Sequence, residues 1–311
     1  MNGKSDTLII LNPNSGTCNS NEILNNFVNK YFKNGFYKLL ITKSEKELDN
    51  IIEEIDDFKH ILVVGGDGTL SSLIQKTFDK KLLFGHIPTG SGNGLTNSLL
   101  HSKGIKFDNN YELIYKNLAD AIIKNRENKI DTMMVKKLKS NTTINSFLFV
   151  SCGIFSNLDL NTEWMRRLGE IRFILGAIYE LIKYFFFGNS IQGRLEYLDD
   201  NCIKMTEIGN FAFFLASNMS HTSRTSITSP YSKPDDGYIY LSYLKEPTNT
   251  WELLQVLLGL DDGSYINKLK YRRTKWFKFI PSNGVLDIDG ERHQIEPIEV
   301  SINPKSLRFL Y

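Results

Sequence analysis

The first hundred residues alternate between short, wholly apolar runs and longer amphipathic ones. Residues 8–11 and 61–64 are apolar without interruption, which is typical of strands buried on both faces. Residues 22–32 and 45–55 carry apolar side chains at helical spacing. Because strands that alternate with helices form parallel sheets, residues 1–126 are expected to make a parallel sheet covered by helices on both faces.

After residue 126, short strand-like runs separated by turn residues replace this alternation. They occur at 129–137, 146–151, 193–198, 210–216, 237–244, 274–280, 284–288 and 298–302. Their spacing predicts an antiparallel β-sandwich over residues 127–311, interrupted by helices at 166–187 and 251–258. We therefore expect an N-terminal, Rossmann-like α/β domain and a C-terminal β-sandwich domain, with an active site in the cleft between them.

Two glycine-rich loops follow strands of the predicted parallel sheet, GGDGT at 65–69 and PTGSGN at 88–93. Ligands of such sheets bind at the carboxyl ends of the strands. Glycine lets a backbone approach phosphate oxygens, and the helix that follows each loop directs its first amides at an anion. Neither loop is a P-loop, because no Gly-Lys-Ser/Thr follows at the required spacing. Together the loops predict one phosphate-binding pocket.

Asp67 places a negative charge in this predicted anion site. It would repel phosphate unless it bound a metal ion or accepted a proton. A strand-to-helix turn with Asp67 as its cap explains the GGDG loop equally well when that loop is considered alone.

Charge and cysteine content argue against several functions. Lysine plus arginine total 37 against 35 acidic residues, a net charge of +2, so nothing indicates a nucleic-acid partner. Cys18, Cys152 and Cys202 are widely separated, which disfavours a disulfide framework or a zinc site. Residues 173–187 include two charges and are too few to span a bilayer. Without a signal-like segment, a cytoplasmic protein is expected, with peripheral contact to a membrane surface.

Three motifs, in order, resemble one family. Asn12-Pro13 after the first strand, GGDGT and PTGSGN together are similar to the catalytic domain of diacylglycerol and sphingosine kinases. Residues 159–173, DLNTEWMRRLGEIRF, are similar to the lipid-site segment of sphingosine kinases, and RRLGExRF is the most specific string for that branch. The late Asp-Gly-Glu at 289–291 also matches, so the resemblance runs from about residue 8 to about residue 300.

The resemblance implies an ATP-dependent, Mg²⁺-using kinase that phosphorylates the primary hydroxyl of a sphingoid base, with Asp67 as general base. It places these residues at the nucleotide: Asn12, Pro13, Asn14, Thr42, Lys43, Ser44, Glu45, Lys46, Gly66, Gly68, Thr69, Gly90, Ser91, Gly92, Arg166, Arg172, Asp289, Gly290 and Glu291. It places these at the lipid: Gly65, Gly66, Asp159, Phe173 and Leu175. Asp159 would pair with the ammonium group of the lipid.

Each of these residues also has a simpler interpretation. Asp159 could cap a helix, and Arg166 and Arg172 could be solvent-exposed helix residues. Residues 289–291 could form only a hairpin turn, since Asp-Gly is a common turn pair. The apolar residues 173–179 could be plain core, or could border a lipid tail and face a membrane.

The sequence also departs from the family pattern. Ser72 and Gln75 stand where the family usually has Glu and Asn, and Thr17 and Asn19 replace the usual basic residues after the first turn. Ceramide or diacylglycerol kinase activity is the nearest alternative. An NAD kinase shares GGDGT but would not explain PTGSGN or residues 166–173. A non-catalytic lipid-binding pseudokinase is favoured by Ser72 and disfavoured by Asp67.

Overall fold

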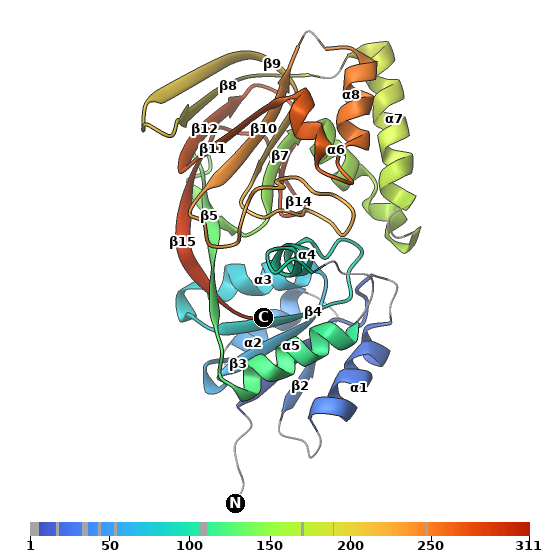
Figure 1. Ribbon diagram of the computed structural model, residues 1–311, viewed down its shortest axis with the longest axis vertical. Coiled ribbons are helices and arrows are strands. Elements are labelled where there is room, and N and C mark those ends of the chain that lie inside the picture. The colour runs from blue at the N-terminus through green and yellow to red at the C-terminus, as the bar shows by residue number, and fades with distance from the viewer. Residues whose placement is uncertain are drawn as a thin grey trace, which may run out of the picture.

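The protein folds into two stacked domains. The computed structural model describes residues 6–16, 19–32, 37–42, 45–52, 55–105, 111–168, 171–188, 190–246 and 248–311. The N-terminal domain forms the lower half of Figure 1, and the C-terminal domain forms the upper half, with α7 and α8 along one side.

The N-terminal domain is the expected parallel sheet. Strands β1 (Thr7–Leu11), β2 (Lys38–Ile41), β3 (His60–Gly65) and β4 (Leu83–Pro88) pair in the order β2-β1-β3-β4. Every residue of β1, β3 and β4 is buried. An uninterrupted apolar run thus indicates a strand covered on both faces, as the sequence predicted.

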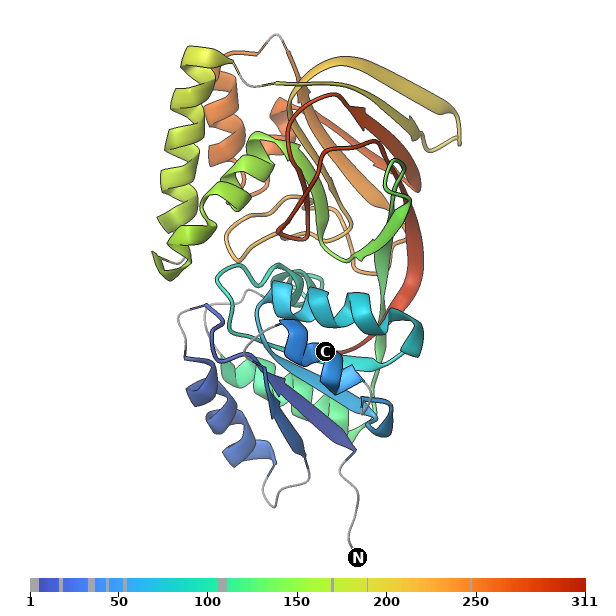
Figure 2. The ribbon, with the colours of Figure 1, turned by 180° about the vertical axis from the view of Figure 1, so that it is seen from behind.

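Helices cover both faces of this sheet. Helices α1 (Ser20–Tyr31) and α5 (Tyr111–Ile123) pack on the side chains of Ile9 and Leu62. On the other face, α2 (Glu45–Ile52), α3 (Asp67–Thr77) and α4 (Gly94–His101) contribute to the core that contains Leu8 and Ile61. Figure 1 shows α5 in front of the sheet, and Figure 2 shows α2 and α3, in blue and cyan, on the opposite side.

The C-terminal domain is antiparallel. Its strands are β5 (Asn128–Lys137), β6 (Thr142–Ser146), β7 (Phe149–Gly153), β8 (Ile191–Leu198), β9 (Lys204–Ser217), β10 (Ile239–Lys245), β11 (Lys270–Thr274), β12 (Trp276–Pro281), β13 (Leu286–Ile288), β14 (Glu291–His293) and β15 (Ile298–Leu310). Their inward-facing side chains form a second core, in which the rings of Phe214 and Phe279 stack 4.2 Å apart.

The last strand joins the two domains. β15 pairs with β5 in the antiparallel sense, and its end, from Arg308 to Leu310, pairs in parallel with β4. The ladder is interrupted between Asn303 and Leu307, where the Asp131 carboxylate accepts the Lys305 N–H at 2.7 Å. The sequence predicted this strand only to residue 302, because the polar run at the irregularity hides its continuation. The division of the chain after residue 126 stays a prediction, and the β5–β15 ribbon runs across it.

Two helical features differ from expectation. Helix α6 (Ile154–Asn161) was not predicted. The single helix expected at 166–187 is divided into a 3₁₀ segment, Glu163–Leu168, and α7 (Ile171–Phe187), with residues 169–170 outside the described chain. Helix α8 (Thr250–Leu258) agrees with expectation.

None of the described helices combines the length and apolarity needed to cross a bilayer.

Candidate active site

A cavity of about 710 Å³ opens between the two domains. At one end it is lined by the polar loops that follow β1, β3 and β4. At the other it is lined by apolar side chains of α6, α7 and α8, among them Leu158, Ala177 and Leu257. The cavity therefore joins a region suited to phosphate with a region suited to hydrocarbon.

The three N-terminal loops touch through their backbones. A Cβ atom on Gly90 would lie 2.6 Å from the Gly66 Cα. A Cβ atom on Gly16 would lie 2.1 Å from the Thr89 carbonyl oxygen, and Gly16 also has a φ of +56°. Only glycine allows this approach, so the backbones themselves form the floor of the polar end.

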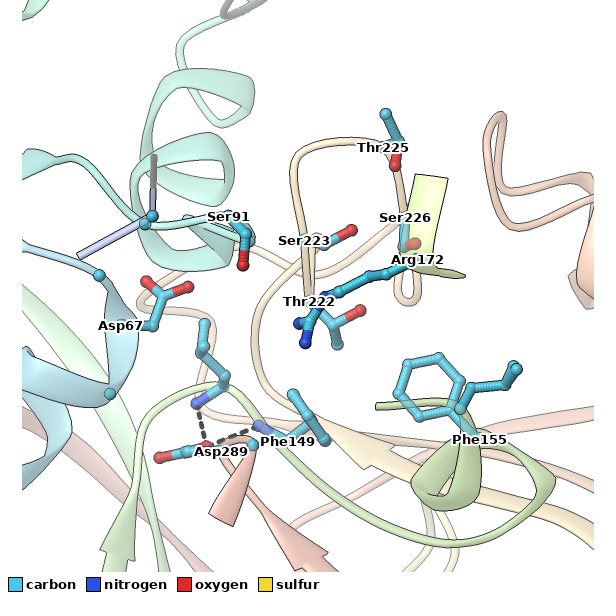
Figure 3. Close-up of a pocket in the computed structure, with 18 of the residues that line it drawn as sticks. Asp67, Ser91, Phe149, Phe155, Arg172, Thr222, Ser223, Thr225, Ser226 and Asp289 are labelled. Carbon is cyan, nitrogen blue, oxygen red and sulfur yellow. Dashed lines mark hydrogen bonds between the residues drawn. The ribbon is translucent and has the colours of Figure 1, made fainter. Parts of the chain in front are cut away.

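Asp67 links two of these loops. It is the first residue of α3, and its carboxylate accepts the N–H groups of Gly94 at 2.7 Å and Leu95 at 3.4 Å, which begin α4. Its side chain thus caps the neighbouring helix. These bonds hold the carboxylate at the cavity wall, where Figure 3 shows it opposite Arg172.

Two asparagines set the shape of the loops. Asn12 Nδ2 donates to Thr69 Oγ1 at 2.8 Å and so joins the first loop to GGDGT. Asn93, at a φ of +56°, closes PTGSGN on itself: its Oδ1 accepts the Gly90 N–H at 2.9 Å, and its Nδ2 donates to the Gly90 carbonyl at 2.7 Å. This turn leaves Ser91 and Gly92 lining the cavity.

His86 supports the same region from behind. Its Nε2 lies 3.0 Å from the Gly65 carbonyl oxygen and its Nδ1 lies 2.9 Å from Thr96 Oγ1. Burial lowers the pKa of His86 to about 4, so the ring is neutral at pH 7. A carbonyl can only accept, so Nε2 carries the proton and Nδ1 accepts from the Thr96 hydroxyl. The neutral ring thereby ties β4 and α4 to the end of β3.

The pH dependence of stability follows from this. His86 in the unfolded chain titrates near its ordinary pKa of 6.5 and in the folded chain near 4. The unfolded chain therefore binds more protons between these values, so stability is complete above pH 6.5 and is lost as the pH falls toward 4. We expect a loss of roughly 1–3 kcal/mol in wild type and a smaller loss in His86→Gln, whose Nε2 can still donate to Gly65.

Urea unfolding at pH 7 and pH 4.5, followed by circular dichroism, measures this loss. Some pH dependence should remain in the variant, because burial also lowers the pKa of His221 to about 4. Equal losses in His86→Gln and wild type would show that His86 does not contribute.

Asp289 is held deep in the C-terminal wall. Burial raises the pKa of its carboxyl above the ordinary value. The carboxylate accepts four hydrogen bonds, from Ser146 Oγ at 2.7 Å and from the N–H groups of Phe147, Leu148 and Phe149 at 3.0 Å each. Asp289 also has a φ of +52° at the turn between β13 and β14. The hairpin interpretation of Asp-Gly-Glu therefore holds, and the turn also lines the cavity.

The C-terminal domain adds one cation and a cluster of hydroxyl groups. Arg172 is 6 % exposed and lines the cavity, so the interpretation of this residue as a solvent-exposed arginine was wrong. Figure 3 shows its guanidinium group beside Thr222, on a loop that also carries Ser223, Thr225 and Ser226. Sequence reasoning missed this loop, although four of the five residues in TSRTS at 222–226 carry hydroxyl groups.

Helix α7 is apolar on two faces. Ile174, Ala177, Ile178 and Leu181, at spacings of three, one and three, line the cavity. A second set lies outside the cavity lining and is 44–69 % exposed: Leu175, Tyr179, Ile182 and Phe186. Leu175, predicted at the lipid, therefore lies on the outer set, because the helix period turns it away from Ile174 and Ile178.

Most of the predicted nucleotide-site residues meet at the cavity. Its lining includes Asn12, Asn14, Thr42, Gly66, Asp67, Gly68, Thr69, Gly90, Ser91, Gly92, Arg172, Asp289, Gly290 and Glu291. Pro13 and Gly65 are not part of the lining, since Gly65 ends the buried strand β3 and supports His86. Sequence reasoning did not identify the lining residues Gly16, Leu48, Phe149 and Phe155.

Several predicted residues cannot be placed. Lys43 and Ser44 lie outside the described residues. The backbone is described, but the side chain is not, for these residues: Glu45, Lys46, Asp159, Arg166 and Phe173. Asp159 stands near the end of α6, so the alternative that it caps the start of a helix was wrong.

Comparison with known proteins agrees with this geometry. Residues 6–135 match the diacylglycerol kinase catalytic domain. Sphingosine kinase 1 of Mus musculus is 23% identical, over 96% of this chain and 89% of its own. Sphingosine kinase 1 of Arabidopsis thaliana is 24% identical, over 91% and 67%. A crystal structure of a putative diacylglycerol kinase from Bacillus anthracis superimposes with a TM-score of 0.71 at 17% identity, covering 99% of this chain and 96% of that one.

Residues 6–135 therefore form a diacylglycerol kinase catalytic domain, and nearly the whole chain is similar to sphingosine kinases at 23–24% identity. This catalytic domain indicates a lipid kinase, and such a kinase uses ATP. The two departures from the family pattern now have structural settings. Ser72 lines the cavity. Gln75 forms hydrogen bonds with the backbone of Asn145, in the other domain.

Proposed function

We propose that this lipid kinase transfers the γ-phosphoryl group of ATP to the primary hydroxyl of a sphingoid base. The observation that carries the proposal is the continuity of the cavity, in which glycine loops and Asp67 at one end join the apolar surfaces of α6, α7 and α8 at the other. A long-chain lipid bound along those helices would present its head group to Asp67. The similarity to sphingosine kinases over nearly the whole chain supports a sphingoid base as the acceptor.

The polar end fits a nucleotide. Phosphate oxygens would accept from backbone amides of the glycine loops and from Ser91, and the buried Arg172 would supply positive charge from the opposite wall. Phosphoryl transfer needs mainly positioning and charge neutralisation, which these groups provide. Asp67 would accept the proton of the attacking hydroxyl, since its carboxylate is already oriented by the Gly94 amide.

Magnesium would complete the charge balance. Within the described residues no group of three His, Cys, Asp or Glu side chains could hold a metal ion by itself. Mg²⁺ in kinases is commonly bound by one or two carboxylates together with substrate phosphates. Glu291 fits this role, because an oxygen of its carboxylate lies 3.7 Å from the position of a Cβ on Gly68, above the GGDG loop. Asp289 fits less well, because four donors already surround its carboxylate. When bound, the ion would neutralise charge on the phosphates.

The acceptor can be identified by a direct assay. Purified protein is given labelled ATP and magnesium with sphingosine, ceramide, diacylglycerol or NAD in turn. We expect transfer to sphingosine at the highest kcat/KM. Preferred transfer to ceramide, diacylglycerol or NAD would replace the proposed acceptor, and nucleotide binding without any transfer would indicate a pseudokinase.

Asp159→Ala tests recognition of the ammonium group. If Asp159 pairs with that charge, as the family resemblance implies, the KM for sphingosine should rise by roughly tenfold or more, the value of a charge-assisted hydrogen bond. The KM for ATP should not change. Asp199→Ala, in the exposed turn after β8, is the matched control. An unchanged KM for sphingosine in Asp159→Ala would contradict the pairing.

We also propose that the outer face of α7 rests on a membrane surface and that the protein is cytoplasmic, reaching its substrate at the bilayer. Ile182 and Phe186 are 54 % and 69 % exposed, and the same helix lines the lipid-sized end of the cavity. Exposure of a second apolar face to water is unfavourable, and burial of that face in the surface of a bilayer removes the cost.

The double variant Ile182→Glu/Phe186→Glu is expected to bind vesicles of phosphatidylcholine and phosphatidylserine at least about tenfold more weakly, since burial of each side chain stabilises by about 1.5–3 kcal/mol. Vesicle cosedimentation measures the change. Ile208→Glu removes an isoleucine that is 64 % exposed on β9, a strand of the C-terminal sheet, and serves as the control. Equal weakening by both variants would exclude α7 as the specific contact.

A further inference from the structure

Helix α3, which begins with Asp67, is tied to the C-terminal domain by a side chain near its other end. Gln75 Nε2 donates to the Asn145 carbonyl oxygen at 2.6 Å, and the Asn145 N–H donates to Gln75 Oε1 at 2.9 Å. The carboxamide thus pairs with both polar groups of Asn145, much as a neighbouring strand would. Two bonds in opposite directions fix the orientation of the two elements as well as their separation.

Asn145 leads directly into the turn that Asp289 holds. The next four residues, from Ser146 to Phe149, supply the four donors to the Asp289 carboxylate. Two residues after Asp289, a carboxylate oxygen of Glu291 lies close to Gly68, within the first turn of α3. A series of neighbouring groups therefore connects Gln75, near the end of α3, with Asn145 and Asp289 of the C-terminal domain. The series continues to Glu291, which lies near the start of α3.

Other connections between the domains, within the described residues, are of different kinds. The β5–β15 ribbon is interrupted between Asn303 and Leu307, where two strands alone allow bending. Ser98 Oγ contacts the backbone of His221, which holds α4. Apolar side chains of α3, among them Leu73, share a buried core with Leu148 of the C-terminal domain, and Gln75 adds a directional contact between α3 and β6.

This arrangement matters because the cavity is built from both domains. Asp67 comes from α3, whereas Arg172 and Phe149 come from the C-terminal domain. Misplacement of reacting groups by about 1 Å can lower a rate by about 10²-fold. Building on the lipid kinase function proposed above, we propose that Gln75 is a positioning residue. It holds the GGDGT loop in its place opposite the C-terminal side of the cavity, which includes Arg172 and Phe149. Its loss should therefore slow phosphoryl transfer and leave ATP binding unchanged.

Gln75→Met tests the proposal, because methionine has a similar length and can make neither bond. We expect kcat for lipid phosphorylation to fall about tenfold, the effect of roughly one net hydrogen bond, while the KM for ATP stays within about twofold. Lys76→Met is the control: Lys76 is the next residue of α3, and its side chain pairs with Asp49 inside the N-terminal domain. It should leave both constants unchanged.

Gln75→Glu adds a reversible version of the same change. An ionised glutamate can accept from the Asn145 N–H but repels the Asn145 carbonyl oxygen, whereas the protonated acid can both donate and accept. The ratio of variant to wild-type kcat should therefore rise as the pH is lowered from about 8 to about 5, toward the ordinary pKa of glutamate. A flat ratio would contradict the two-bond geometry.

Hydrogen exchange of residues 142–149 provides a readout that does not depend on activity. Faster exchange there in Gln75→Met is expected, with no change in Lys76→Met.

An unchanged kcat per ATP-binding site in Gln75→Met would overturn the proposal. A parallel loss of kcat and of ATP-binding sites would also overturn it, because that result indicates a purely structural role. If Gln75→Met does not fold, Gln75→Glu decides by the pH profile. A wild-type protein that phosphorylates no lipid would refute the proposed function. Unchanged hydrogen exchange at residues 142–149 in Gln75→Met would instead refute the positioning role of Gln75.

Discussion

Replacement of Asp67 by asparagine is expected to lower kcat for lipid phosphorylation by roughly 10²–10⁴-fold, the usual contribution of a general base. The asparagine oxygen can still accept the Gly94 N–H, which the Asp67 carboxylate accepts at 2.7 Å, so the start of α4 should stay in place. What the variant loses is the ability to take a proton from the acceptor hydroxyl. Initial rates at saturating ATP and lipid measure the loss, and calorimetric titration with ATP measures the affinity.

The control for this experiment is Asp49→Asn. Asp49 is exposed on α2 and pairs with Lys76, outside the cavity lining. We expect that variant to transfer phosphate at the wild-type rate. If Asp67→Asn instead loses ATP affinity, Asp67 is mainly a structural cap of α4 or a ligand of the nucleotide-bound metal.

Gly90→Ala is expected to produce the second large effect, loss of nucleotide binding. The new Cβ would lie 2.6 Å from the Gly66 Cα, a backbone atom that cannot turn aside. The PTGSGN and GGDGT loops must therefore separate. Overpacking of this kind costs about 1–3 kcal/mol, and we expect ATP affinity to fall at least about tenfold, measured by calorimetry.

Gly92→Ala provides the comparison within the same loop. Its Cβ would meet nothing closer than Asp67 Oδ2 at 3.7 Å, an ordinary contact. We therefore expect its effect on ATP affinity to be several-fold smaller than that of Gly90→Ala. Equal effects would mean that the loop tolerates no side chain at all, and that the contact with Gly66 is not the reason.

The parallel sheet and the glycine loops could be predicted because their sequence signals are local. An apolar run such as residues 61–64 is buried on both faces whatever surrounds it, and the loops that follow parallel strands meet at one edge. The motif at 289–291 was recognised for the same reason. Its buried aspartate and the bonds to residues 146–149 could not be foreseen, since they join segments more than 130 residues apart.

The predictions that failed concern segments in which local helix preference competes with packing against residues distant in the sequence. Most of residues 166–187 are helix-forming apart from Gly169 and Gly176, but the chain places a 3₁₀ segment before α7. Arg172, at the start of α7, lines the cavity. The family resemblance placed Leu175 at the lipid, and the apolar pattern of α7 did not show that Ile174 and Ile178 line the cavity instead. The hydroxyl-rich loop at 222–226 gave no periodic signal, and contacts with a distant segment bring it to the site: Ser223 forms a β-bridge with Asn93, and the backbone of Thr222 lies close to Gly94.

The partnership of β15 with β4 has a consequence for how the protein is made. β4 is wholly buried, and its free edge is covered only when residues 308–310 arrive, more than 200 residues later in the chain. Until then a ribosome-bound chain exposes an apolar strand edge, which is a template for aggregation. The N-terminal domain should therefore not fold as an isolated fragment ending near residue 126, and removal of residues 308–311 should reduce soluble yield more than their number suggests.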